Sequence, residues 1–243
     1  MKAVIMQPTY LPWLGYFDLI DQADVFVFLD TVQFEKQSWQ QRNKIRTSEG
    51  LEWITVPVLI KGRFGQLIRD VEINPVAFPE KHIKQIKQHY GRAPYFHKYF
   101  DELADLLIMS SKDLSLNNLN IELIQWACSK LSLSPVFYRS SDLGVTGKRT
   151  ELLVNVLKAI KATQYLSPLS SWDYLKNDHC QMSSHNIALG FHNYAHPEYR
   201  QVYDPFIPFV SIIDLVFNEG ERSAAVIRSG RREEFRPDAL VIK

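Results

Sequence analysis

The chain has 243 residues, 46% of them hydrophobic, and a formal net charge of +1. This hydrophobic content supports a sizeable core and argues against a disordered chain, while two cysteines are too few for a secreted disulfide scaffold. No apolar run reaches the roughly 18 residues of a membrane span, and Met1-Lys2 leads into a strand without a signal-peptide pattern. We therefore expect a cytoplasmic protein with no membrane span.

The first half of the chain alternates apolar runs with polar turns. Residues 3–8 and 25–30 are short apolar runs typical of buried parallel strands, and residues 16–24 between them have helical spacing. Residues 51–60 predict a third buried strand, and residues 80–90 predict an amphipathic helix. This order is typical of an α/β domain, whose ligand site lies at the carboxyl ends of the strands.

The second half continues the alternation. Helices are predicted over 101–109, 119–131 and 147–160, with Asn117-Asn118 as caps of the second, and a closing helix is predicted near the C-terminus. Strands are predicted over 135–143, 163–168 and 187–194. We expect a single α/β domain over residues 1–243, with a mostly parallel sheet, flanking helices and a soft subdivision near 100–115.

A loop punctuated by proline and glycine joins the first strand to the first helix. Free backbone N–H groups at such a helix start favour an anion. The candidate ligand-binding residues of this loop are Gln7, Tyr10, Trp13, Gly15 and Tyr16. The alternative is that the three aromatic side chains only pack in the core.

Polar and cationic side chains follow the second strand. Asp30 ends that strand and is a candidate general base. Arg42 and Lys44 are candidates for holding phosphate, and Gln33 and Asn43 are candidate amide contacts. Residues 36–98 carry twelve Lys and Arg against five Asp and Glu, a net charge of +7. The alternatives are a loop that satisfies its own polar groups and a solvated lysine-rich helix.

Two further candidates lie outside these loops. Arg92 follows the 80–90 helix and is a third candidate phosphate contact. His196 lies in a proline-bounded polar loop and is a second candidate base, although a histidine there can also be a surface residue. We predict no metal site, because Cys180 beside His179 gives only two adjacent ligands.

The first loop resembles the opening of the nucleotidyltransferase-like α/β fold, in which a His-x-Gly-His motif holds a nucleotide phosphate. The matching residues here are Trp13-Leu14-Gly15-Tyr16, so the glycine is present and both histidines are absent. The resemblance implies a Rossmann-like core with additional helices, and the missing imidazoles imply a different reaction.

A longer series of motifs resembles the WbqC-like family of bacterial proteins. The series comprises Gln7-Pro8-x-Tyr10-x-Pro12-Trp13-x-Gly15-Tyr16-Phe17, Asp30-x-x-Gln33-Phe34, Arg42-Asn43, Thr55-Val56-Pro57-Val58, Ala93-Pro94-Tyr95-Phe96, Tyr165-Leu166-Ser167-Pro168, His196-Pro197-x-Tyr199-x-Gln201 and Ser211-Ile212-Ile213-Asp214-Leu215-x-Phe217-Asn218. The resemblance implies a setting in O-antigen and other surface-polysaccharide biosynthesis. It also implies transfer of glycine or another small acyl group to an amino-sugar, and it carries no established catalytic residues.

Three functional hypotheses follow. The first is an acyl or aminoacyl transferase that binds a small anionic ligand, either a nucleotide-sugar or an acyl donor, and needs no cofactor. The second is a degenerate Mg²⁺-dependent nucleotidyltransferase. The third is a non-catalytic scaffold of a glycan-assembly complex. No nucleic-acid partner is expected, because the chain lacks a base-stacking module.

Overall fold

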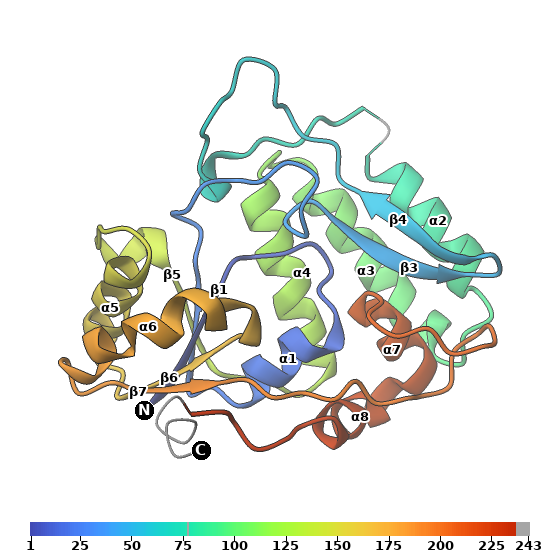
Figure 1. Cartoon of the computed structure of the whole chain (residues 1–243). Helices are drawn as coiled ribbons and strands as arrows, with labels where there is room; N and C mark the ends of the chain where they lie inside the picture. The colour runs from blue at the N-terminus through green and yellow to red at the C-terminus, as the bar shows by residue number, and fades with distance from the viewer. Residues whose placement is uncertain (77, 237–243) are drawn as a thin grey trace.

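The computed structural model describes residues 1–76 and 78–236, with side chains omitted at residues 176 and 177. Five parallel strands form one sheet in the order β5-β2-β1-β6-β7 (Figure 1). They are β1 (Lys2–Met6), β2 (Val25–Phe28), β5 (Val136–Arg139), β6 (Gln164–Ser167) and β7 (Ala188–Phe191). The predicted α/β, Rossmann-like class with a mostly parallel sheet is confirmed.

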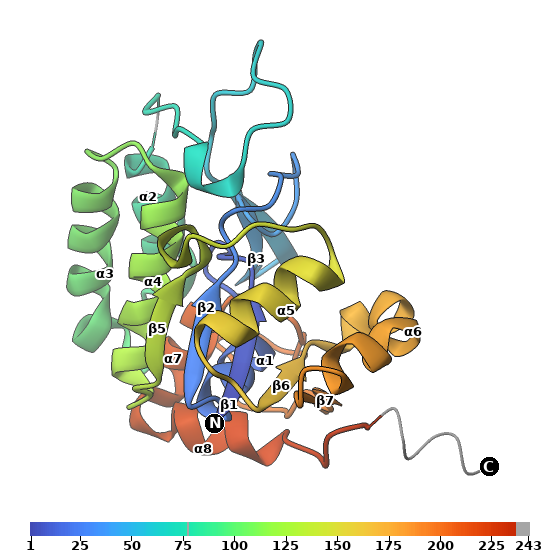
Figure 2. The same ribbon diagram turned by 90° about the vertical axis from the view of Figure 1, so that its left-hand side faces the viewer.

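Helices cover both faces of this sheet (Figure 2). Val4 of β1 faces the larger core, which also holds side chains of α1 and α4, whereas Ala3 and Ile5 face a second core built with α5 and α6. Alternating side chains of one strand thus serve both layers. The helices are α1 (Leu14–Asp21), α2 (Glu80–Tyr90), α3 (Phe96–Ser110), α4 (Leu116–Lys130), α5 (Thr150–Ala159), α6 (Trp172–Ser183), α7 (Ile212–Glu219) and α8 (Ser223–Ser229).

The strand order reverses direction at β1. The chain moves from β1 to β2 and β5 on one side, and then returns to β6 and β7 on the other side. The crevice outside the carboxyl ends of β1 and β6 is therefore the topological switch point, where open α/β sheets bind their ligands.

Several predicted elements differ from the structure. The strand predicted over 51–60 is β4 (Gly50–Thr55), which pairs with β3 (Arg42–Thr47) in an antiparallel hairpin outside the main sheet. The residues of β4 are mostly exposed. The prediction of a buried strand was wrong here because an apolar run does not show which sheet a strand joins. Helix α6 was not predicted, and Ser115 caps α4 in place of Asn117-Asn118.

Helix α1 begins at Leu14, two residues before the predicted start, so Asp18 and Asp21 lie in its later turns. Helix α3 runs through much of the region where the sequence suggests a soft subdivision, and it packs against α4. Within the described ranges, none of the helices combines the length and apolar character needed to cross a bilayer.

Candidate functional site

Two adjoining cavities open at the switch point. The first, of about 570 Å³, is walled by ring side chains and is called the aromatic cavity. The second, of about 340 Å³, contains Gln7 and Gln40 and is called the glutamine cavity. The two cavities share five lining residues, which come from the ends of β1 and β6 and from the loop after β2. These are Met6, Thr9, Trp39, Pro168 and Ser170. One bound molecule can therefore reach both.

The aromatic cavity is shaped by close packing at the start of α1. The Trp13 indole lies over Gly15 so tightly that a Cβ at Gly15 would meet it at 2.2 Å. Tyr194 packs edge-on against the Trp13 ring, with centroids 5.7 Å apart, and Phe209 lies at 5.4 Å. The indole thus occupies the space that a side chain at position 15 would need, and only glycine leaves that space free.

A histidine–aspartate pair lies at the wall of the aromatic cavity. His192, just after β7, lines the cavity, and its Nε2 lies 2.7 Å from Oδ2 of the fully buried Asp18 on α1. A carboxylate can only accept, so the imidazole donates from Nε2. In the neutral ring Nδ1 then carries the lone pair. No hydrogen bond to Nδ1 is found among the residues that the structure describes.

Asp18 is held by three partners. Besides His192, its carboxylate accepts from Gln22 Nε2 at 2.7 Å and from Arg231 Nε at 2.9 Å. Arg231 belongs to a C-terminal segment that forms bridges at Tyr194 and Phe191, on either side of His192. The orientation of the pair is therefore fixed from α1, β7 and the C-terminal segment at once.

The glutamine cavity offers polar groups of another kind. Oε1 of Gln7 accepts from Gln40 Nε2 at 2.9 Å, and this bond leaves the Gln7 amide nitrogen available to a ligand. Ser170 and the partly exposed Tyr174 lie on the wall formed by the segment after β6. These groups suit a neutral polar ligand, while Glu35 adds one carboxylate to the wall.

Five of the predicted ligand-binding residues line these cavities. Gln7 lines the glutamine cavity, and the aromatic cavity is lined by Trp13, Gly15, Tyr16 and Asn43. The Asn43 amide, however, donates to the carbonyl oxygens of Tyr10 and Leu11 at 3.2 and 2.7 Å. Asn43 therefore holds the loop in place, which is a support role, and its amide is not free to stabilise an oxyanion.

Asp30 occupies a different environment from the one its strand-end position predicts. It is fully buried, and its carboxylate accepts from Ser140 Oγ, from the amide nitrogen and hydroxyl of Ser141, and from Asn117 Nδ2, at 2.8–3.1 Å. Asp30 ties together the ends of β2 and β5 and the start of α4. It does not line either switch-point cavity, and the four hydrogen bonds to its carboxylate come from the protein itself.

His196 packs behind the cavity wall. Its ring stacks on Trp13, its Nδ1 lies 2.9 Å from the Pro197 carbonyl oxygen, and its Nε2 accepts from the Phe209 N–H at 3.1 Å. Burial lowers the pKa of His196. Both nitrogens are therefore engaged within the protein, and the ring packs against Trp13.

The remaining candidates lie away from the cavities. Tyr10 is buried in the core and its hydroxyl lies 2.8 Å from Nδ1 of His82. Gln33 is exposed beside Leu67, and Arg92 is exposed in the turn after α2. Arg42 and Lys44 lie on the outer face of the β3–β4 hairpin and contact the Trp53 ring.

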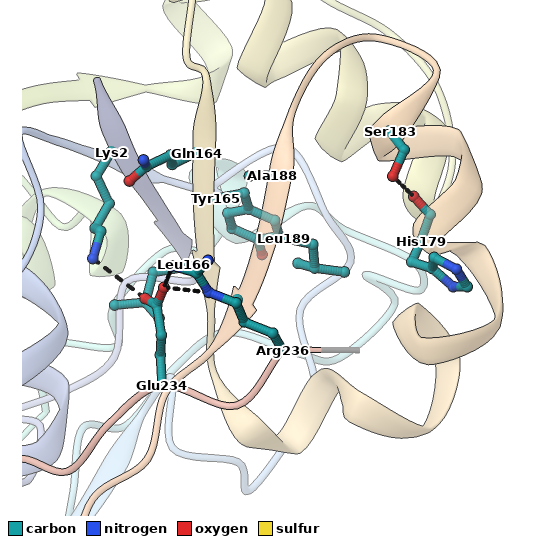
Figure 3. A pocket seen from close by; sticks show the side chains of 11 residues that line it. Lys2, Gln164, Tyr165, Leu166, His179, Ser183, Ala188, Leu189, Glu234 and Arg236 are labelled. Carbon is teal, nitrogen blue, oxygen red and sulfur yellow. Dashed lines mark hydrogen bonds and ion pairs between the residues drawn. The ribbon is translucent and has the colours of Figure 1, made fainter. Parts of the chain in front are cut away.

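A third cavity, of about 120 Å³, lies beside β6 and β7 (Figure 3). Glu234 lies between Lys2 and Arg236 there and forms ion pairs with both, at 3.3 and 2.8 Å. These charges satisfy one another within the chain. The small volume and paired charges make this cavity a weaker ligand site than the two at the switch point.

Sequence reasoning missed Asp18 and His192. His192 lies just past the carboxyl end of β7, a strand that the sequence located correctly. Asp30 was selected because ligand sites lie at the carboxyl ends of strands, and the same reason selects His192. Asp18 carried no comparable signal, because its role depends on a residue 174 positions away.

Comparisons with known proteins agree with the sequence motifs. A family model described as the WbqC-like protein family matches residues 7–226, a range that includes Asp18 and His192. The uncharacterized protein Rv1507c of Mycobacterium tuberculosis (strain ATCC 25618 / H37Rv) is 36% identical over 232 residues, which cover 95% of this chain and 99% of that protein. No solved structure matches the chain. The chain belongs to the WbqC-like protein family.

Proposed function

We propose that this protein transfers an acyl or aminoacyl group, such as glycyl, to the amino group of a sugar during surface-polysaccharide biosynthesis. The observation that carries the proposal is the Asp18–His192 pair at the wall of the aromatic cavity. A neutral amine loses a proton as its nitrogen forms the amide bond, and a histidine oriented by a carboxylate is suited to accept that proton.

The proposed step uses the two cavities together. The sugar lies in the aromatic cavity, where the rings of Trp13, Tyr194 and Phe209 cover its apolar C–H groups. An activated acyl donor, such as a thioester, places its uncharged acyl end in the glutamine cavity near Gln7. The shared wall at Thr9 and Ser170 brings the two substrates side by side.

His192 and Gln7 act on opposite ends of the reacting bond in the proposed step. The sugar amine forms a bond to the acyl carbon while Nδ1 of His192 takes a proton from the nitrogen. The carbonyl oxygen gains negative charge, which the Gln7 amide N–H stabilises by donating to it. The carbonyl then re-forms, and the bond to the leaving group breaks. His192 returns its proton to that group, and Asp18 stabilises the imidazolium meanwhile.

The test is a mass-spectrometric assay of amide formation on a panel of amino-sugars and their nucleotide esters, with acyl-coenzyme A and aminoacyl-adenylate donors. For a productive pair, His192→Gln should lower kcat by about 10²–10⁴ and leave the melting temperature near the wild-type value. His185→Gln, at an exposed histidine after α6, is the matched control and should retain full activity. Equal activity of H192Q and wild type would exclude His192 as the base. No product with any pair would favour the scaffold hypothesis.

A further inference from the structure

The outer face of the β3–β4 hairpin gathers two cations over one indole. Arg42 and Lys44 pair across the hairpin with Thr55 and Trp53, and cross-strand partners share a face. The guanidinium carbon of Arg42 lies 4.1 Å from the Trp53 ring centroid, and Nζ of Lys44 lies 5.1 Å from it. The ring holds both cations in place through cation–π contacts.

These cations lack the acidic partners that some other cations of the described chain have. Arg63 pairs with Glu72 and Lys130 with Glu102. Over residues 1–76 and 78–236, by contrast, neither Arg42 nor Lys44 forms an ion pair. The Nε atom of Arg42 is also buried without a hydrogen-bond partner. Two neighbouring cations without an anion repel each other, so an anion bound between them would be stabilising.

The hairpin carboxylate that adjoins Trp53 in the sequence is directed elsewhere. Glu52 precedes Trp53, and alternation along β4 places its side chain on the other face. There it accepts from Gln85 at 2.6 Å and lies 3.5 Å from His89. The outer face around Trp53 therefore keeps a local positive charge, to which Thr55 can add a hydroxyl donor.

An aromatic contact joins this face to the candidate site. The Trp53 ring lies 5.3 Å from the ring of Trp39, which is half exposed and lines both switch-point cavities. A molecule whose one end fills a cavity can therefore pass over Trp39 and reach Arg42 and Lys44.

We infer that Arg42 and Lys44 form a phosphate subsite outside the cavities, so that the acceptor is a sugar carried on a phosphate or diphosphate. The inference rests on the proposed function and names its substrate class. The guanidinium fork and the ammonium would hold the phosphate oxygens while the sugar ring lies in the aromatic cavity. Nucleoside diphosphates and lipid diphosphates share this chemistry.

The test measures the binding of three probes at low salt by calorimetry, namely pyrophosphate, UDP and geranyl diphosphate. Lys44→Ala and Arg42→Gln should each weaken all three by about tenfold or more, and added salt should narrow that difference. Lys158→Ala removes one positive charge at an exposed lysine of α5, and it should bind all three probes with the wild-type affinity. Tighter binding of UDP or of geranyl diphosphate than of pyrophosphate identifies the nucleotide or the lipid as the carrier.

The inference is overturned if wild type binds none of the probes, or if K44A and R42Q bind them as K158A does. The acyl-transfer assay separates this failure from failure of the proposed function. Unchanged KM and kcat in K44A and R42Q, with activity lost in H192Q, would reject the phosphate subsite and support the transferase function. Probe binding that depends on Arg42 and Lys44, with no amine acylated, would support the phosphate subsite and reject the transferase function.

Discussion

Oδ2 of Asp18 lies 2.7 Å from Nε2 of His192, although 174 positions separate the two residues. Helix α1 supplies the carboxylate and the exit from β7 supplies the imidazole. The fold thus places an oriented imidazole at the wall of the aromatic cavity, at the sheet's switch point.

The Asp18 carboxylate should control the tautomer of His192. We expect Asp18→Asn to lower kcat of acyl transfer by about 10²–10⁴, because an amide can donate to Nε2 and so favour the wrong tautomer. Asp21→Asn is the matched control, since Asp21 pairs with Arg228 and Arg231 and not with His192. Comparable losses in D18N and D21N would mean that the ion-pair cluster matters for folding and not for catalysis.

Gly15 should be required for the shape of the aromatic cavity. A Cβ there would meet the Trp13 indole at 2.2 Å, so Gly15→Ala must displace the ring. We expect ligand binding and activity to fall at least about tenfold, because a misplaced wall residue disturbs substrate positioning. Gly62→Ala introduces backbone strain in open space, at φ +73, and should lower stability without changing binding. Tight ligand binding by G15A would show that Trp13 does not line the site.

Asp30 should contribute to stability and not to catalysis. Asp30→Asn turns an acceptor of four hydrogen bonds into a group that also donates, which should lower the free energy of unfolding by about 2–4 kcal/mol. Denaturant unfolding measures this loss, and the exposed neighbour Asp142 gives the control D142N. A folded D30N with wild-type stability and no activity would restore Asp30 as the catalytic base.

Asp214 should make stability fall between about pH 4 and pH 6. Burial raises its pKa to about 6 in the folded protein, although Tyr199 and Gln201 donate to it. The folded state then binds a proton that the unfolded state has lost, so stability decreases as pH rises through this range. We expect the stability of Asp214→Asn relative to wild type to rise by about 2 kcal/mol from pH 4 to pH 6.5 and to stay constant above it.

His82 acts in the opposite direction over a similar range. Burial lowers its pKa to about 4, so the unfolded state binds the extra proton and stability rises with pH up to about 6.5. The difference between D214N and wild type is therefore the informative quantity, because the His82 contribution cancels in it. A difference that does not change with pH would show that Asp214 titrates normally.

The fold was predictable where local pattern decides it. The apolar runs at 3–8 and 25–30 are parallel strands, and the periodic segment 80–90 coincides with α2. The sheet to which residues 51–60 belong depends on pairing with β3, and Ser115 caps α4 through a side-chain bond that the sequence does not show. Tertiary pairing and capping geometry set these details.

The candidate site was predictable in its location and only partly in its residues. The loop after β1 lies at the switch point, so its residues line the cavities. They include Gln7, Trp13, Gly15 and Tyr16. Asp30 obeys the same rule, but Ser140 and Ser141 after β5 cover it, which depends on the strand order.

The most direct test of the central claim is a crystal structure of the protein with glucosamine or its UDP ester bound. We expect the sugar ring in the aromatic cavity against Trp13, with the amine nitrogen within hydrogen-bond distance of Nδ1 of His192. A sugar bound with its amine away from His192, or in the cavity beside Glu234, would contradict it.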